Sequence, residues 1–524
     1  MAALATEAGA QTAFGLGSTQ ADDARAIAVD GAGNSYITGR FRLTIDFDPG
    51  PGVASLSSVS GFSNYVASYD ASGALRYAFV LDGGGNVPER GIAVDGSGNV
   101  YVTGYFAGVV DFDPGSGVAT LNSGTGGNLF VASYDPTGGF RWAFNLAGDD
   151  PAVAEAGTAI AVDLAGNSYL TGEFSGETDF DPSGAELLLE ANGTTDAFVA
   201  SYDTNGGLRF AVGFGGTQRD QGLGIAIDGS GNSYVTGSFR DTADFDPGPG
   251  VQSLVSAGNR DVFLASYTDA GGFRYALGVG DAFDDVGYGV AVDAAGNAFA
   301  TGRFLGTADF DPGAGVVNRV AAGNGDIFLA SYTSTGALRF AHGFGQGNDE
   351  SGYAADVDAN GRVYITGFFP NALDFDPGPG VALLDPVGTD TFVAIYENSG
   401  AFVDAYSFES NSSSSSIGYG LALDATGRAY VTGTFSGGND SVDFDPGPGS
   451  VRLDTVGSTD FYVSSLGPAQ PVPALGPLGI GAAAILLGWL GARRAGDAKA
   501  VPRIALRASS AASRSPVSTL ARSS

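Results

Sequence analysis

A sequence block that returns seven times dominates the chain. Each copy reads approximately A-V-D-x-x-G-N-x-Y-x-T-G-x-F, then D-F-D-P-G, then F-V-A-S-Y-D, and finally L-R-Y-A-F. The aspartate of the first motif marks each copy, at Asp30, Asp95, Asp163, Asp228, Asp293, Asp358 and Asp424. These aspartates lie 65 to 68 residues apart. A fixed period of this size predicts one continuous array of structural units rather than several independent domains.

Four short strands are predicted in each copy, because runs of β-branched and aromatic residues alternate with turns that contain Gly, Asn or Pro. In the second copy these strands are residues 91–95, 100–103, 130–134 and 140–144. The D-F-D-P-G motif is predicted to be a loop, and no helical period occurs before residue 474. Seven units of four strands indicate an all-β fold, a seven-bladed β-propeller.

The two ends of the array predict that the ring is closed. The seventh copy stops after Phe461-Tyr462-Val463 and lacks its last strand, whereas the chain opens with a segment of that kind, Thr12–Gly17. This N-terminal segment is therefore expected to supply the fourth strand of the seventh blade. An open solenoid would instead need complete or specially capped terminal repeats.

Composition excludes several classes of function. The chain has a net charge of −33, and 7 of its 24 basic residues follow residue 492. Such an acidic surface repels phosphate backbones, so no nucleic-acid partner is expected. The absence of cysteine excludes disulfides, thiol catalysis and cysteine-ligated zinc. The single histidine, His342, has no second histidine with which to build a metal site, and we interpret it as incidental.

The D-F-D-P-G motifs supply paired carboxylates, which are candidate ligands for Ca²⁺ because that ion prefers oxygen. These candidate residues are Asp46, Asp48, Asp111, Asp113, Asp179, Asp181, Asp244, Asp246, Asp309, Asp311, Asp374, Asp376, Asp443 and Asp445. The favoured alternative is structural: the first aspartate ends a strand, the phenylalanine enters the core, and the second aspartate caps the turn. Apart from Ca²⁺ at these loops, no cofactor is expected.

Two further repeated features are also interpreted as framework. The aspartate and asparagine of A-V-D-x-x-G-N are expected to stabilise a hairpin turn through hydrogen bonds to the backbone. One position of the fourth strand holds an arginine in five copies, namely Arg76, Arg141, Arg209, Arg274 and Arg339. We expect each to pair with neighbouring carboxylates, although a ring of arginines that binds an anionic ligand is an alternative.

The position between T-G and F changes from copy to copy within the constant frame. It holds Arg40, Tyr105, Glu173, Ser238, Arg303, Phe368 and Thr434. This variation predicts an exposed rim and therefore a surface for a partner. Three longer connections, at residues 148–157, 411–416 and 436–441, also break the period, and loops on a rigid scaffold often carry recognition.

The repeats resemble the seven-bladed β-propeller (SBBP) repeat family. The resemblance rests on G-I-A-V-D-G-S-G-N-V-Y-V-T-G at Gly91–Gly104 and D-V-F-L-A-S-Y at Asp261–Tyr267, and it covers about residues 10–466. It implies a bacterial propeller, often secreted or at the cell surface. The family carries no catalytic signature that could be transferred to this chain.

Residues 474–492 form an uncharged apolar stretch that is followed by Arg493-Arg494. This length suits a membrane-spanning helix, and the arginines would favour the cytoplasmic side, which places the propeller outside. A helix packed on the propeller is the alternative. The stretch, with V-P-A-L-G-P-L-G at Val472–Gly479, resembles a degenerate bacterial C-terminal sorting signal of the IPTL/PEP type.

The remaining segments complete the predicted organisation. Residues 1–9 and 493–524 are expected to be disordered, and residues 467–473 to be a linker between the propeller at 10–466 and the apolar helix. The first residues lack the basic start and apolar centre of a secretory signal, so an exported protein would need a start upstream of this one.

Together these features predict a non-catalytic β-propeller of the cell envelope or cell surface, anchored in the membrane through residues 474–492. It would act as a scaffold for binding or structural display, with a protein or glycan partner that the sequence does not name. One alternative is a Ca²⁺-stabilised adhesion module. Another is a carbohydrate-active or lactone-type propeller enzyme, which would need non-repeated polar residues converging on the central channel.

Overall fold

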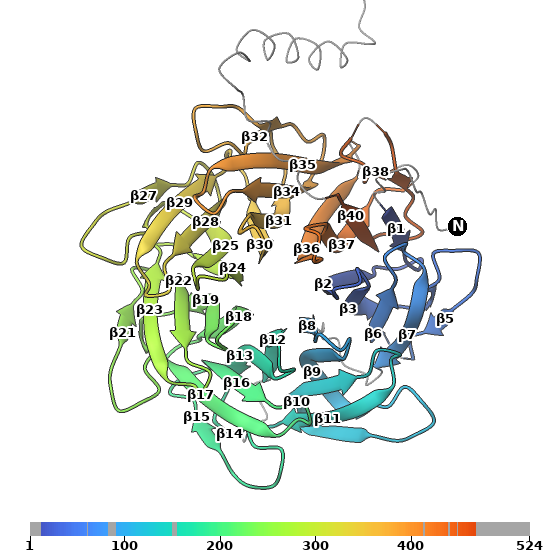
Figure 1. Ribbon diagram of the computed structural model, residues 1–524, viewed down its shortest axis with the longest axis horizontal. Coiled ribbons are helices and arrows are strands. Elements are labelled where there is room, and N and C mark those ends of the chain that lie inside the picture. Colours follow the sequence, from blue (N-terminus) through green and yellow to red (C-terminus); the bar gives the residue numbers. More distant parts are fainter. Residues whose placement is uncertain are drawn as a thin grey trace, which may run out of the picture. The chain divides into compact units, whose positions relative to one another are not determined.

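A computed structural model describes residues 12–59, 61–81, 91–148, 155–411, 414–438, 441–447 and 449–467. The described residues contain strands, turns and loops, and their strands form seven four-stranded antiparallel blades around a central axis (Figure 1). The innermost strand of each blade contacts the innermost strands of both neighbouring blades, so the ring is continuous. The predicted all-β, seven-bladed β-propeller is therefore confirmed.

The strands of each blade follow one another outward from the axis. Blade 1 consists of β2 (Asp23–Val29), β3 (Ser35–Phe41), β6 (Ser63–Tyr69) and β7 (Leu75–Leu81), and blade 2 of β8 (Gly91–Val94), β9 (Val100–Asp111), β10 (Thr120–Tyr134) and β11 (Phe140–Leu146). Blade 3 consists of β12 (Ala156–Val162), β13 (Ser168–Phe174), β16 (Asp196–Tyr202) and β17 (Leu208–Gly216), and blade 4 of β18 (Gln221–Ile227), β19 (Ser233–Phe239), β22 (Asp261–Tyr267) and β23 (Phe273–Val279). Blade 5 consists of β24 (Val286–Val292), β25 (Ala298–Phe304), β28 (Asp326–Tyr332) and β29 (Leu338–Phe344), and blade 6 of β30 (Ser351–Val357), β31 (Val363–Phe369), β34 (Asp390–Tyr396) and β35 (Phe402–Ser410). Blade 7 consists of β36 (Ser415–Leu423), β37 (Ala429–Ser436), β40 (Asp460–Leu466) and β1 (Thr12–Leu16).

Short hairpins, which the sequence pattern did not predict, flank the D-F-D-P-G loops. They are β4 (Thr44–Asp46) and β5 (Ser55–Ser57), β14 (Glu177–Asp179) and β15 (Leu188–Glu190), β20 (Thr242–Asp244) and β21 (Ser253–Val255), β26 (Thr307–Asp309) and β27 (Asn318–Val320), β32 (Leu373–Asp374) and β33 (Leu383–Leu384), and β38 (Val442–Asp443) and β39 (Arg452–Leu453). In blade 2 the same hairpin is continuous with β9 and β10. Strands of two or three residues are too short to show a period in the sequence.

The N-terminal strand closes the ring as predicted. β1 pairs antiparallel with β40, with Thr12 opposite Ser465 and Leu16 opposite Phe461. Phe14 of this strand is 1 % exposed, and its ring lies 4.6 Å from the ring of Tyr69 in blade 1. β1 therefore completes blade 7 and also packs against the next blade.

The innermost strands approach one another so closely that one position in each holds only glycine or alanine. These residues are Ala26, Gly91, Ala159, Gly224, Gly289, Ala354 and Gly420. A Cβ added to Gly289 would lie 2.9 Å from the Cα of Ala354 in the next blade. Since backbone atoms cannot move aside cheaply, a larger side chain here would push neighbouring blades apart.

A β-bulge directly precedes this small residue. In the pairing of β2 with β3 the register skips from Ala24 to Ala26, and β24 skips from Gly287 to Gly289 against β25. The same shift occurs in β12, β18, β30 and β36, whereas the description of β8 begins after this position. A bulge leaves one residue unpaired and redirects its side chain. The unpaired residues are Arg25, Thr158, Leu223, Tyr288, Tyr353 and Tyr419.

The fourth-strand arginines link neighbouring blades, but not in the way that was predicted. Arg76 donates hydrogen bonds to the hydroxyls of Tyr36 and Ser68 in its own blade, and to the carbonyl oxygen of Pro136 in the next blade at 2.9 Å. The other four reach the equivalent carbonyls of Thr204, Asp269, Ser334 and Asn398. Pairing with carboxylates is therefore wrong for these arginines, because the turn that faces each one presents a carbonyl oxygen.

Several predictions fall on residues that the structure does not describe. These are the disordered ends at 1–9 and 493–524, the apolar helix at 474–492 with its sorting signal, and nearly all of the linker at 467–473. Within the described part of the chain, no helix has both the length and the apolar character needed to cross a membrane.

Replacing Phe14 by alanine should lower the free energy of unfolding by about 3 kcal/mol, because the change leaves a cavity at the closing blade. Denaturant unfolding followed by tryptophan fluorescence measures this. Val53→Ala, at a position that is 80 % exposed, is the control and should change stability by less than about 0.5 kcal/mol. Equal unfolding midpoints for the Phe14 variant and the parent chain would contradict the closing role of β1.

Candidate binding site at the central channel

The aspartates of the D-F-D-P-G motifs serve the backbone of their own loops. Asp46 Oδ1 accepts hydrogen bonds from the amides of Asp48 and Ala54, and Asp48 Oδ1 accepts one from the amide of Gly50. The other six copies repeat this pattern. The central phenylalanine of each loop is at most 1 % exposed, as expected for a structural motif.

These loops do not assemble a larger set of metal ligands. Among the described residues, no three histidine, aspartate or glutamate side chains come together in a way that would hold a metal ion. The hairpin aspartates are used similarly: Asp30 accepts hydrogen bonds from the amides of Ala32 and Asn34 and from the hydroxyl of Tyr36. The conspicuous aspartates of the repeat therefore hold turns in shape.

The variable position between T-G and F is only partly the exposed rim that was predicted. Glu173, Ser238 and Thr434 are 7 %, 1 % and 8 % exposed, so exposure is wrong for these three residues. They lie in the second strand, where the first and third strands flank them on both sides. Glu173 is held by Arg219, whose guanidinium lies 2.7 Å from its carboxylate. Arg40, Tyr105, Arg303 and Phe368 are half-buried.

A cavity of about 520 Å³ lies in the central channel. Six of its lining residues are the bulged residues of the innermost strands, and the seventh is a member of the predicted rim. The lining residues are Arg25, Arg40, Thr158, Leu223, Tyr288, Tyr353 and Tyr419. The volume falls in the range of small-molecule sites, which is about 300–1,000 Å³. The channel therefore contains a cavity of suitable size at an inner position whose residue type changes from blade to blade.

The side chains around this cavity form a continuous arc over blades 5, 6, 7 and 1. The ring of Tyr353 lies 5.1 Å from that of Tyr288 and 5.2 Å from that of Tyr419. The guanidinium of Arg25 lies 4.3 Å above the ring of Tyr419, and Phe368 of the predicted rim stacks on Tyr353 at 5.9 Å. The arc therefore consists of aromatic rings and ends at the guanidinium group of Arg25.

The charge of the arc is positive, in contrast to the rest of the protein. Arg25 and Arg40 lie 3.1 Å and 2.8 Å from the same carboxylate, that of Asp23, so two cations face one anion. Burial lowers the pKa of Arg25, but Asp23 and Tyr419 outweigh this effect, so the pKa lies above its usual value and the guanidinium stays charged. Burial also raises the pKa of Tyr288 and Tyr353, which keeps their hydroxyls protonated.

The bulged position was missed because it lies immediately before A-x-A-V-D and reads as part of an ordinary strand. An informative signal was nevertheless present, since six of the seven aligned copies place Arg, Thr, Leu or Tyr between two positions that hold Gly or Ala in those copies. Such an isolated change of residue type within a constant frame indicates that the side chain has left the packed interior.

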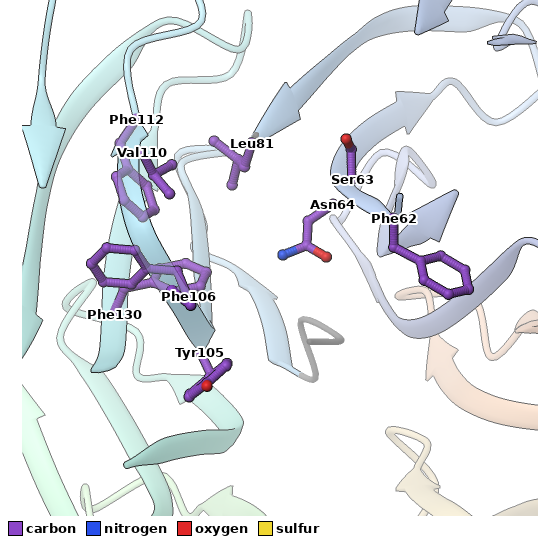
Figure 2. Close-up of a pocket in the computed structure, with 10 residues that line it drawn as sticks. Phe62, Ser63, Asn64, Leu81, Tyr105, Phe106, Val110, Phe112 and Phe130 are labelled. Atoms are coloured by element: carbon purple, nitrogen blue, oxygen red, sulfur yellow. The ribbon is translucent and has the colours of Figure 1, made fainter. Parts of the chain in front are cut away.

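A second cavity, between blades 1 and 2, is too small for a ligand. Figure 2 shows it bordered by Phe106, Phe112 and Phe130 on one side and by Asn64 on the other, and its volume is about 10 Å³. A single water molecule needs at least about this much room. It is a gap in the packing between two blades.

The single histidine belongs to the framework of the outer strands. His342 Nε2 lies 2.9 Å from the carbonyl oxygen of Gly400 in the next blade, and its ring stacks on Phe340 at 5.0 Å. Burial lowers its pKa below the usual value. The side chain contributes to a blade junction and takes no part in the channel site.

Pairs of buried carboxyl groups, which the sequence did not reveal, lie at four blade junctions. A Cβ added to Gly215 would lie 2.7 Å from Asp196 Oδ1 and 2.8 Å from Asp220 Oδ2, so the two groups converge where this glycine leaves space. Burial raises the pKa of Asp196 to about 6 and that of Asp220 to about 7. The equivalent pairs are Asp261 with Asp285, Asp326 with Glu350, and Asp460 with Asp22.

A match to a known protein family agrees with this architecture. A family model described as "Beta-propeller repeat" (SBBP) matches residues 214–238, which run from the end of blade 3 into the second strand of blade 4. Fold and match together define a β-propeller repeat protein. Over 272 residues the chain is 22 % identical to an uncharacterized WD repeat-containing protein of Acanthamoeba polyphaga mimivirus, and over 151 residues it is 28 % identical to the regulatory protein FlaEY of Caulobacter vibrioides.

These alignments are partial. They cover 47 % and 29 % of this chain, and 18 % and 15 % of the viral and Caulobacter relatives. Similar solved structures include a gluconolactonase from Xanthomonas campestris, with a TM-score of 0.29, 13 % identity, and coverage of 70 % of this chain and 91 % of that one. A DUF4221-family member from Bacteroides vulgatus has a TM-score of 0.32 and 9 % identity, and covers 89 % and 98 % of the two chains.

The buried carboxyl pairs predict an unusual pH dependence of stability. A carboxyl group with a raised pKa in the folded state binds protons more tightly there than in the unfolded chain, where its pKa is about 3.9. The free energy of unfolding should therefore fall as the pH rises from about 4 to about 7, by about 1.4 kcal/mol for each unit of pKa shift. Denaturant unfolding at a series of pH values measures this slope.

Asp196→Asn should make the fall in the free energy of unfolding between pH 4 and pH 7 shallower, because it removes one titrating group. Asparagine suits this position, since blade 2 has Asn128 there. Asp181→Asn is the control: hydrogen bonds from Ser183 lower the pKa of Asp181, so this change acts below pH 4. Stability that rises steadily from pH 4 to pH 7 in the parent chain would contradict the role given to these pairs.

Proposed function

We propose that this protein is a non-catalytic binding module of the cell envelope that holds its ligand at the central channel. The observation that carries the proposal is the placement of the bulged residues. Six blades share one framework, yet at the bulged position they present Arg25, Thr158, Leu223, Tyr288, Tyr353 and Tyr419 to one cavity. A packing role would favour the same residue in every blade, whereas recognition of one asymmetric ligand requires different ones.

The composition of the cavity favours binding over catalysis. Its seven described lining residues include no carboxylate and no histidine that could act as a general acid or base. The carboxylate of Asp23, beside Arg25 and Arg40 of the lining, is 6 % exposed and is held by these two guanidinium groups. A carbohydrate-active enzyme would need a pair of available carboxylates near the substrate.

The envelope location rests on the sequence. The apolar stretch at 474–492 and the arginine pair after it support a membrane anchor with the propeller outside the cell. The strongly acidic surface suits a soluble, non-adhesive exterior that leaves the channel as the place of recognition. The partner is then a glycan or protein of the cell surface or its surroundings.

The proposal is tested by comparing ligand binding of the full chain with that of a Tyr288→Ala, Tyr353→Ala double variant on an array of surface glycans and peptides. Loss of the two rings should weaken binding of any genuine ligand at least about tenfold, since aromatic side chains dominate binding energy. Val316→Ala, on a loop position that is 70 % exposed, is the control and should bind as the parent does. Undiminished binding by the double variant, with an unchanged melting temperature, would overturn the channel site.

A further inference from the structure

The channel site has the chemistry to recognise a sugar ring that carries a carboxylate. We infer that the ligand is an acidic glycan, bound with a ring face on the tyrosine arc and its carboxylate toward Arg25. This inference rests on the proposed function and assigns the class of ligand. Three features of the site carry it: the aromatic surface, the local charge, and the available hydrogen-bond donors.

The aromatic surface fits a ring better than an extended chain. Tyr288, Tyr353 and Tyr419 come from consecutive blades, and their planes are inclined at 62° and 43° to one another. They therefore curve around the cavity rather than forming one flat stack. The C–H face of a sugar packs well against such aromatic rings, which present large apolar surfaces of negative potential to the positively polarised hydrogens.

The charge of the site selects against cations and for carboxylates. An aromatic cage alone would suit a quaternary ammonium group. Here Arg25 already lies over Tyr419, and its side chain remains 29 % exposed while that of Arg40 is 21 % exposed. Arg303 also lies close to Tyr288 and Tyr353, but Asp349 at 2.6 Å balances its charge, so the excess positive charge comes from Arg25 and Arg40, which share Asp23. Guanidinium groups bind planar carboxylates through charge-assisted hydrogen bonds.

The hydroxyl groups complete the match. Among the described residues, no hydrogen-bond partner of the Tyr288 and Tyr353 hydroxyls is seen, and both side chains border the cavity. They are free to donate to the hydroxyl or ring oxygens of a sugar. Next to Tyr288, Leu223 of blade 4 presents an apolar surface, and the Thr158 hydroxyl already donates to the carbonyl oxygens of Thr171 and Gly222. Polar recognition is therefore concentrated on the arc. A cavity of about 520 Å³ accommodates one or two sugar residues.

Trigalacturonic acid and its fully methyl-esterified form make a matched pair of probes, because the ester replaces each charged carboxylate by a neutral methyl ester and leaves the sugar rings unchanged. Isothermal titration of the purified full-length chain should show binding of the acid, and binding about tenfold weaker for the ester, since hydrogen bonds to charged groups are strong. Arg25→Gln should remove most of this difference, and Tyr353→Ala should weaken binding of both probes. Arg452→Gln, in the outer strand β39 of blade 7, is the charge-matched control and should behave as the parent chain does.

The outcomes separate the ligand class from the proposed function. Equal affinity for the acid and the ester, or no binding of either while the Tyr288, Tyr353 double variant still loses an array ligand, overturns the acidic glycan and leaves the channel site intact. An aspartate-rich peptide of the same charge that binds more tightly than trigalacturonic acid reassigns the site to an acidic protein. Binding of the acid that survives both Arg25→Gln and Tyr353→Ala places it elsewhere and overturns the inference.

Discussion

The close approach of the innermost strands at the axis is the constraint on which the rest of the structure depends. A methyl group is the largest side chain found where Gly289 and its six counterparts meet the next blade, because backbone atoms lie directly opposite. The bulge beside each small residue then turns one side chain out of the sheet and into the channel. The geometry that closes the ring thus also produces positions around the channel whose side chains are not needed for packing between the blades.

The sequence was sufficient to predict the architecture because the same pattern of strands and turns occurs seven times. The four strands, the hairpin turns and the closing role of Thr12–Leu16 all follow from local patterns that repetition made unmistakable. The site was harder to predict because side chains from six blades converge there without any sequence proximity. The same applies to Asp196 and Asp220, which belong to different blades and meet only across a junction. The arginine partners were misassigned because the sequence does not show which groups a turn directs toward its neighbour.

Charge is distributed by role in this molecule. The abundant aspartates of the loops and turns are satisfied by backbone amides at the surface, and they give the chain its net charge of −33. A smaller set is buried at the junctions, where burial favours the protonated form. The channel site combines the guanidinium groups of Arg25 and Arg40 with three tyrosine rings. A ligand that reaches the cavity therefore meets an electrostatic environment opposite in sign to the one it crosses.

The pairing of β1 with β40 also has a mechanical consequence. Thr12 lies opposite Ser465, so the outward-leading ends of both strands lie at the same end of the pair. A tension that draws these two ends apart acts perpendicular to the strands and breaks their hydrogen bonds one after another. Shear, which would load all the bonds together, does not arise in this arrangement. The hydrogen bonds that close the ring at blade 7 can thus be broken one at a time by a pull on these two ends.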